Sequence, residues 1–182
     1  MEWRKQCSCC FRIAVNVAAT QFADPGFRHG VEQILAETGL PTEILELELT
    51  ESTFVGDFAQ ARETFIALQD RGVSVAIDDF GIGQSSLSYL HELPFQRLKI
   101  DRSFVREISS ATEQHPLVEN PIRLGRDLGM TTIAEGIDRA DQVELLREMG
   151  CTEGQGYFFS RPLRAEDVLP ALQACQIASG IA

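Results

Sequence analysis

The chain has 182 residues, of which 44% are hydrophobic and 24% charged, and it carries a formal net charge of −11. Its length is that of one domain with a substantial core, and its composition excludes wholesale disorder. The negative charge disfavours a nucleic-acid polymer as a partner, and no apolar stretch reaches the roughly 20 residues of a membrane helix.

Extended apolar segments alternate with helical patterns along the chain. The segments predicted to be strands are 11–17, 44–50, 73–77, Arg97–Ile100, 131–134 and 156–159. Helical faces are predicted at Phe27, Val31, Ile34 and Leu35, at Ala61, Phe65 and Leu68, and within 117–128, 143–149 and 168–172. A left-handed helix end is expected at Gly39, Gly72, Gly129 and Gly150. The alternation predicts an α/β fold with right-handed crossovers and a parallel sheet.

The number of units leaves two architectures open. Six βα units suit an open, doubly wound sheet, whereas a closed (β/α) barrel normally has about eight. Pro121 falls inside the helix predicted at 117–128, and we expect it to kink that helix or to begin it afresh.

Asp78 and Asp79 close the strand predicted at 73–77 and lead into a glycine-containing loop. Two adjacent carboxylates at the end of a buried strand repel each other unless a cation neutralises them. A strand end followed by such a loop is where α/β enzymes place metal and phosphate chemistry. Taken alone, the pair is equally typical of a turn with one helix-capping aspartate.

Polar side chains recur at or just after the carboxyl ends of the predicted strands. They are Asn16, Glu48, Glu51, Asp78, Asp79, Lys99, Asp101, Glu135 and Gln155. In a parallel α/β fold these ends face one rim, and oxygen ligands of this kind suit Mg²⁺ or Mn²⁺. An aspartate that bridges two ions would make a two-metal phosphodiester site, in which Lys99 neutralises phosphate charge or orients water. Any one of these residues alone is more typical of a solvated surface.

The motifs that contain these residues occur in a fixed order. They are Ala14-Val15-Asn16-Val17, Leu47-Glu48-Leu49-Thr50-Glu51-Ser52, Asp78-Asp79-Phe80-Gly81, Ser85-Ser86-Leu87-Ser88-Tyr89-Leu90, Leu98-Lys99-Ile100-Asp101, Ala134-Glu135-Gly136 and Gln155-Gly156-Tyr157. From about Phe11 to Leu172 the chain resembles the EAL-domain family, bacterial phosphodiesterases that open cyclic di-GMP to linear pGpG. The resemblance implies a TIM-like (β/α) barrel of the EAL type, incomplete, with about six of its βα units present.

The resemblance also implies a role for each rim residue. Asn16, Glu48 and Asp78 would bind a first Mg²⁺ or Mn²⁺ ion, and Asp78 would bridge to a second ion held with Asp79. The catalytic residues would be Lys99 at the attacking water or phosphate, Glu135 as candidate general base, and Gln155 supporting the water. Glu51 would brace the loop that follows Phe80, and the candidate substrate contacts are Asp101, Phe80 and Gly81.

The chain departs from the family pattern in three places. The Glu-Ala-Leu motif, which the family carries on its first strand upstream of the asparagine motif, is not among the 182 residues. We therefore expect a truncated member with domain boundaries at 1–10 (remnant of a preceding helix and loop), 11–176 (truncated EAL domain) and 177–182 (tail). Its open barrel edges would be covered by a homodimer or a partner domain. Ile82 and Gln84 replace the usual Thr and Tyr, and Asp138 stands where a Glu is common.

The sequence motifs also suggest other interpretations. Asp79-Phe80-Gly81 matches the kinase magnesium motif, but the glycine-rich loop and the His-Arg-Asp loop of kinases are missing from the sequence. A magnesium enzyme acting on an enolate, with Lys99 as base, and a catalytically inactive EAL-like module that binds cyclic di-GMP or a protein partner both remain open. The five cysteines are expected to be reduced in a cytoplasmic protein, and a metal site at Cys7, Cys9 and Cys10 is the weaker alternative.

Overall fold

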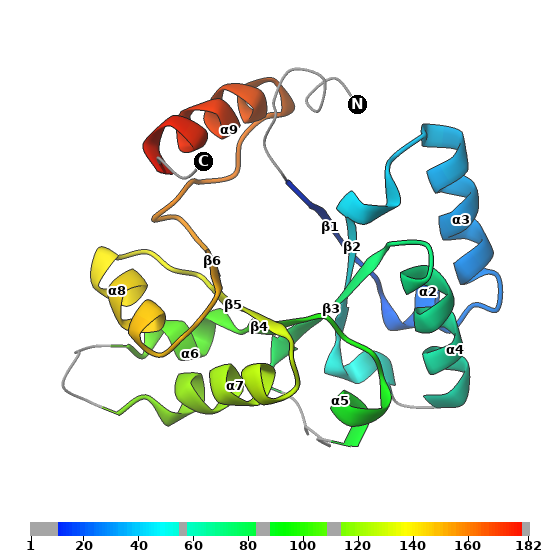
Figure 1. Ribbon diagram of the computed structural model, residues 1–182, viewed down its shortest axis with the longest axis horizontal. Coiled ribbons are helices and arrows are strands. Elements are labelled where there is room, and N and C mark those ends of the chain that lie inside the picture. Colours follow the sequence, from blue (N-terminus) through cyan, green and yellow to red (C-terminus); the bar gives the residue numbers. More distant parts are fainter. Residues whose placement is uncertain (1–10, 55–57, 83–87, 109–113, 180–182) are drawn as a thin grey trace.

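The computed structural model describes residues 11–54, 58–82, 88–108 and 114–179. Six parallel strands pair in chain order to form one curled sheet (Figure 1): β1 Ile13–Asn16, β2 Leu45–Thr50, β3 Ser74–Phe80, β4 Arg97–Ile100, β5 Thr131–Glu135 and β6 Glu153–Gln155. The predicted α/β class, the parallel pairing and the six βα units are therefore confirmed. Each edge strand, β1 or β6, pairs with one neighbour within the described residues, so the sheet is an open half-barrel.

Most helices lie on the outer side of the curl, whereas the C-terminal helix lies over the gap between β6 and β1 (Figure 1). Those predicted from periodicity are α3 Phe27–Thr38, α4 Phe58–Gln69, α7 Pro116–Asp127, α8 Ala140–Glu148 and α9 Ala165–Ser179. Short helices that the periodicity did not predict are α2 Ala19–Phe22, α5 Ser88–Glu92 and α6 Arg102–Arg106, with 3-10 turns η1 Thr42–Ile44 and η2 Glu51–Phe54. Helix α7 continues through Pro121. The glycines predicted to end helices all have positive φ, and the Gly39 N–H caps α3 by donating to the Leu35 carbonyl.

The strand predicted at 156–159 is wrong. Strand β6 lies three residues earlier, at Glu153–Gln155, and a turn follows it in which the Phe159 N–H donates to the Gly156 carbonyl at 3.1 Å. The aromatic residues of that stretch suggested a strand, but Tyr157 is 62% exposed and Phe159 is 52% exposed. Strand β3, in contrast, extends beyond its predicted end, so Asp78 and Asp79 belong to it.

The two faces of the sheet differ in chemistry. Alternate residues point to opposite faces of a strand. The outward set, which includes Leu47, Ile77 and Leu98, packs with helix residues such as Phe65 of α4 to form the hydrophobic core. The inward set is polar and nevertheless buried, and it includes Glu46, Glu48, Asp78, Arg97 and Lys99. The apolar core therefore lies between sheet and helices, and the concave face carries charged groups.

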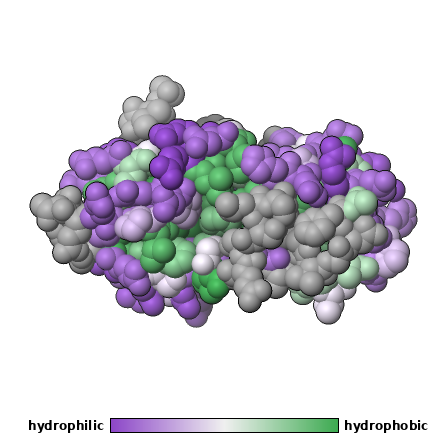
Figure 2. Space-filling view, turned by 90° about the horizontal axis from the view of Figure 1, so that it is seen from below, coloured by the Kyte–Doolittle hydropathy of each residue, from purple (hydrophilic) through white to green (hydrophobic). Residues whose placement is uncertain are grey.

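Apolar surface is also exposed, and Figure 2 shows part of it among polar side chains. A cavity of about 410 Å³ lies between the end of β3 and α7, with Phe80, Phe104 and Leu117 in its lining. Another, of about 420 Å³, lies between β1, β2 and α3, beside the exposed side chains of Val15 and Ile34. None of the helices in the described part of the chain combines the length and apolar character needed to cross a bilayer.

Candidate functional site

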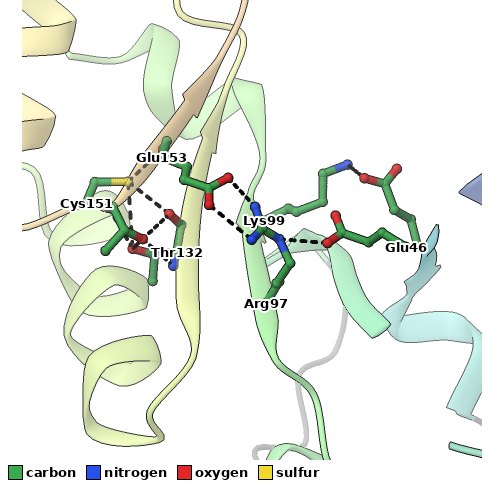
Figure 3. A network of polar contacts seen from close by, with 8 residues as sticks. Glu46, Arg97, Lys99, Thr132, Cys151 and Glu153 are labelled. Atoms are coloured by element: carbon green, nitrogen blue, oxygen red, sulfur yellow. Dashed lines mark hydrogen bonds and ion pairs between the residues drawn. The ribbon is translucent and has the colours of Figure 1, made fainter. Parts of the chain in front are cut away.

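Lys99 lies at the centre of the carboxyl-end rim, surrounded by carboxylates from three other strands. Its Nζ is 2.7 Å from Glu48 Oε1 of β2, 2.9 Å from Asp78 Oδ1 of β3 and 2.8 Å from Glu135 Oε1 of β5. Only 5% of the Lys99 side chain is exposed. Figure 3 shows Lys99 together with part of the polar network on the concave face. One cation thus joins four adjacent strands through their charged ends.

The pKa of Lys99 fixes its chemical role. Burial alone would lower this pKa, but the hydrogen bonds to Glu135, Glu48 and Asp78 outweigh burial, so the pKa lies above its ordinary value. Lys99 is therefore an ammonium ion across the physiological range. This protonation argues against the enolate alternative, which needs Lys99 as a base.

Asp78, Asp79 and Glu135 gather excess negative charge beside Lys99. Each offers one carboxylate oxygen, and these oxygens all lie within 4.8 Å of one another. Burial raises the pKa of Asp79, and the neighbouring charges of Asp78 and Asp101 raise it further. Burial likewise raises the pKa of Glu135 against the opposing effect of Lys99. Oxygen donors crowded in this way are suited to a hard divalent cation.

The backbone at Asp79 is unusual. Its φ is +53°, in the left-handed region, which aspartate tolerates better than most residues. The conformation lies where the pairing of β3 with β4 shifts register, between Ile77 and Phe80, just before the chain leaves the sheet. Next to it, a Cβ on Gly81 would lie 2.6 Å from the Phe104 ring, so only glycine fits there. The backbone at the aspartate pair therefore depends on a left-handed aspartate and on a glycine two residues later.

Glu51 and Asp101 support the rim from loops. Glu51 Oε1 accepts a hydrogen bond from the Gly81 N–H at 2.8 Å, across thirty residues of sequence. Asp101 begins α6, and its Oδ1 accepts from the Ser103 N–H at 2.7 Å. Burial would raise the pKa of Asp101, but the hydrogen bonds from Ser103 lower it below its usual value. The roles of Glu51 as loop brace and of Asp101 as substrate contact stay predictions.

Asn16 and Gln155 flank this cluster on the two edge strands. Asn16 ends β1 in register with Glu48, and Gln155 ends β6 in register with Glu135. Both residues are exposed. The structure thus gathers Glu48, Asp78, Asp79, Lys99 and Glu135 around one point, with Asn16 and Gln155 at the sides of the rim. Position 84 lies outside the described residues, while Ile82 is 59% exposed.

A second charged layer was missed by sequence reasoning. Arg97 contacts Glu46 and Glu153 one step below the Lys99 layer (Figure 3). The available signal was the spacing: Glu46 precedes Glu48 by two residues, as Arg97 precedes Lys99, so each pair shares a strand face. Which charges meet depends on strand register, which the sequence pattern does not reveal.

Comparison with known proteins places the chain in a family. The family described as "EAL domain" matches residues 1–162. The bifunctional diguanylate cyclase/cyclic di-GMP phosphodiesterase MucR of Pseudomonas aeruginosa is 39% identical over 162 residues, which are 89% of this chain and 24% of that protein. The chain spans between 19% and 27% of the length of such curated relatives.

Solved structures of EAL domains agree with this family assignment. The MucR phosphodiesterase in complex with cyclic di-GMP is 38% identical with a TM-score of 0.84, covering 92% of this chain and 68% of that one. The EAL domain of Mycobacterium smegmatis DcpA is 36% identical with a TM-score of 0.87, covering 95% of this chain and 78% of that one. The fold is accordingly an incomplete TIM-like barrel of the EAL type, and the chain belongs to the EAL domain family.

Proposed function

We propose that this chain hydrolyses cyclic di-GMP to linear pGpG in bacterial second-messenger signalling, as an EAL-type, metal-dependent phosphodiesterase. The observation that carries the proposal is the cluster of Glu48, Asp78 and Glu135 around Lys99 at the carboxyl-end rim. Support comes from relatives whose names state this activity and from a 38% identical structure with cyclic di-GMP bound.

The rim residues fit a divalent cation. Lys99 contacts Oε1 of Glu48, Oδ1 of Asp78 and Oε1 of Glu135, and so uses one oxygen of each carboxylate. Asp79 adds a further carboxylate within 4.8 Å of Asp78 and Glu135. We propose that Asn16, Glu48, Asp78 and Asp79 hold one or two Mg²⁺ or Mn²⁺ ions. When bound, such ions neutralise phosphate charge and acidify water.

The side chains of the rim supply the other steps of the hydrolysis. The Lys99 ammonium neutralises negative charge on the phosphate and offsets the mutual repulsion of its three carboxylates. Glu135 accepts the proton of the attacking water, a role that its raised pKa favours. A water oxygen–phosphorus bond forms, the bond from phosphorus to the 3′ oxygen breaks, and solvent protonates that oxygen. Gln155, at the end of β6 beside Glu135, supports the water.

A direct test is hydrolysis by the purified chain. The chain is incubated with cyclic di-GMP and Mn²⁺ or Mg²⁺, and the linear product is quantified by chromatography. We expect turnover that is lost in Asp78→Asn and kept in Asp127→Asn, a matched change at an exposed carboxylate of α7. Turnover that is equal in Asp78→Asn and in the unsubstituted chain would contradict the proposal.

The open sheet edges favour a second candidate, an inactive EAL-like module that binds cyclic di-GMP or a protein. Calorimetric titration with cyclic di-GMP separates the two functions. Binding of cyclic di-GMP without formation of the linear product, with Mg²⁺ or with Mn²⁺, supports the inactive module. Neither binding nor turnover would leave only a protein-interaction role.

We also propose that a second copy or a partner domain covers the edges of the half-barrel. Val15 is 43% exposed beside β1, and Tyr157 and Phe159 are more than half exposed beyond β6. Exposed apolar groups of this size mark interaction surfaces. The cytoplasmic location expected from the sequence stays a prediction, which cell fractionation would test.

A further inference from the structure

Arg97 joins three strands on the concave face below the rim. It lies on β4 two residues before Lys99, and its side chain is 6% exposed. One guanidinium nitrogen donates to Glu153 Oε1 at 3.0 Å, and a second donates to the other oxygen of the same carboxylate. On its opposite side, Nε lies 2.8 Å from Oε2 of Glu46, a buried residue of β2 (Figure 3).

Strand β6 is short and lies at the edge of the sheet. It contains three residues, all exposed, and pairs with β5 along one edge. The chain fits closely against Ile137, because a Cβ on Gly154 would lie 2.6 Å from Ile137 Cδ1 and one on Gly156, just after the strand, would lie 2.0 Å from the Ile137 carbonyl oxygen. The two-nitrogen contact from Arg97 therefore fixes a short edge strand that already fits closely against its neighbour.

Glu153 and Gln155 are two residues apart on this strand and so point to the same face. Gln155 stands in register with Glu135, and the Gln155 carbonyl accepts from the Ile137 N–H at 3.1 Å. Two residues of extended chain span only about 6.6 Å. A displacement of Glu153 is consequently transmitted to Gln155 at the rim.

We propose that Arg97 is a positioning residue that acts through Glu153 to hold Gln155 beside Glu135. Glu46 attracts the guanidinium from the other side as an ion pair, without hydrogen-bond geometry, and so opposes movement of Arg97 outward with β6. Arginine is suited to this task because its planar fork binds both oxygens of one carboxylate, whereas a lysine ammonium cannot. The inference rests on the proposed function, since it assigns Gln155 a part in hydrolysis.

The test is a double-mutant cycle in the full chain. We expect Arg97→Lys and Glu153→Gln each to lower kcat about 10-fold with KM for cyclic di-GMP nearly unchanged. In a Gln155→Ala background, Arg97→Lys should change kcat less than about twofold, because its effect passes through Gln155. Arg126→Lys, at an exposed arginine of α7, is the matched control and should change nothing. Equal losses in both backgrounds, or no loss in the wild-type background, would overturn the proposal.

Amide exchange separates this inference from the proposed function. If the unsubstituted chain forms no linear product, the proposed function fails. The rate of amide hydrogen exchange in peptides covering residues 152–157 then tests whether Arg97 anchors β6. Faster exchange in Arg97→Lys and Glu153→Gln than in the unsubstituted chain and Arg126→Lys supports the anchoring of β6. Exchange that is equal in all four proteins overturns it.

Discussion

Lys99 is the residue on which the electrostatics of the rim depend. Its ammonium lies within 3 Å of three carboxylates in a buried setting, where an uncompensated charge is costly. Because hydrogen bonding keeps its pKa above the ordinary value, the cation persists across the physiological pH range. The residue is thus at once a structural cation and a phosphate-neutralising group.

Replacing Lys99 by Met should therefore affect both stability and catalysis. Without divalent ions, we expect the free energy of unfolding to fall by about 3–5 kcal/mol, since Glu48, Asp78 and Glu135 lose their common partner. Addition of Mn²⁺ should restore more stability in Lys99→Met than in the unsubstituted chain, while kcat stays about 100-fold lower. Denaturant titration with and without Mn²⁺ measures this, and equal metal effects in both proteins would contradict it.

Glu46 gives the lower layer a pH signature. Burial raises its pKa despite the nearby Arg97. The folded chain therefore binds more protons than the unfolded chain just above pH 4.5, the ordinary pKa of a glutamate, so the contribution of Glu46 to stability falls as pH rises through that window. In Glu46→Gln, the unfolding free energy at pH 7 minus that at pH 4.5 should be more positive than in the unsubstituted chain. An unchanged difference would show that Glu46 has an ordinary pKa.

At the scale of elements, the close fit of β6 against Ile137 can be tested with two glycines. Gly156→Ala should lower the unfolding free energy by about 1–3 kcal/mol, because the new Cβ meets the Ile137 backbone at 2.0 Å. Gly30→Ala in α3 meets nothing within 4 Å and should raise it by about 0.4–1 kcal/mol. Denaturant unfolding of both variants provides the comparison, and similar values would refute the tight fit.

The strands differ in how far their positions could be predicted from the sequence. Strands such as β2 and β3 carry regular apolar alternation, so their positions and the placement of Glu48 and Asp78 at one rim were foreseeable. Strand β6 reads Glu-Gly-Gln and lacks residues that favour strands, so its position could not be predicted from the sequence. Tertiary contacts from Arg97 and Ile137 hold it in place instead. The pairing of Arg97 with Glu46 and Glu153 could not be predicted, because it depends on strand register. The short helix α6 could not be predicted from periodicity either, because it depends on the cap at Asp101.

At the scale of the whole molecule, the exposed groove beside β1 predicts self-association. Light scattering should give a mass near twice the 20.2 kDa of one chain. Ile34→Glu, at a 60% exposed position lining that groove, should return the mass to that of a monomer, because a charge would enter an apolar contact. Leu117→Glu on α7 is the matched control at a similarly exposed leucine. Dissociation by Leu117→Glu instead would place the interface on α7.

The location of the apolar core has a consequence for how such a domain is assembled. Since Phe65, Ile77 and Leu98 are buried between sheet and helices, each βα unit completes its main packing with its immediate neighbours. The concave face holds ion pairs within its own strands, such as those of Arg97 with Glu46 and of Lys99 with Glu48 and Glu135. We therefore expect folding of the units and closure of the ring to be separable steps, so that a barrel of this design can be joined from parts.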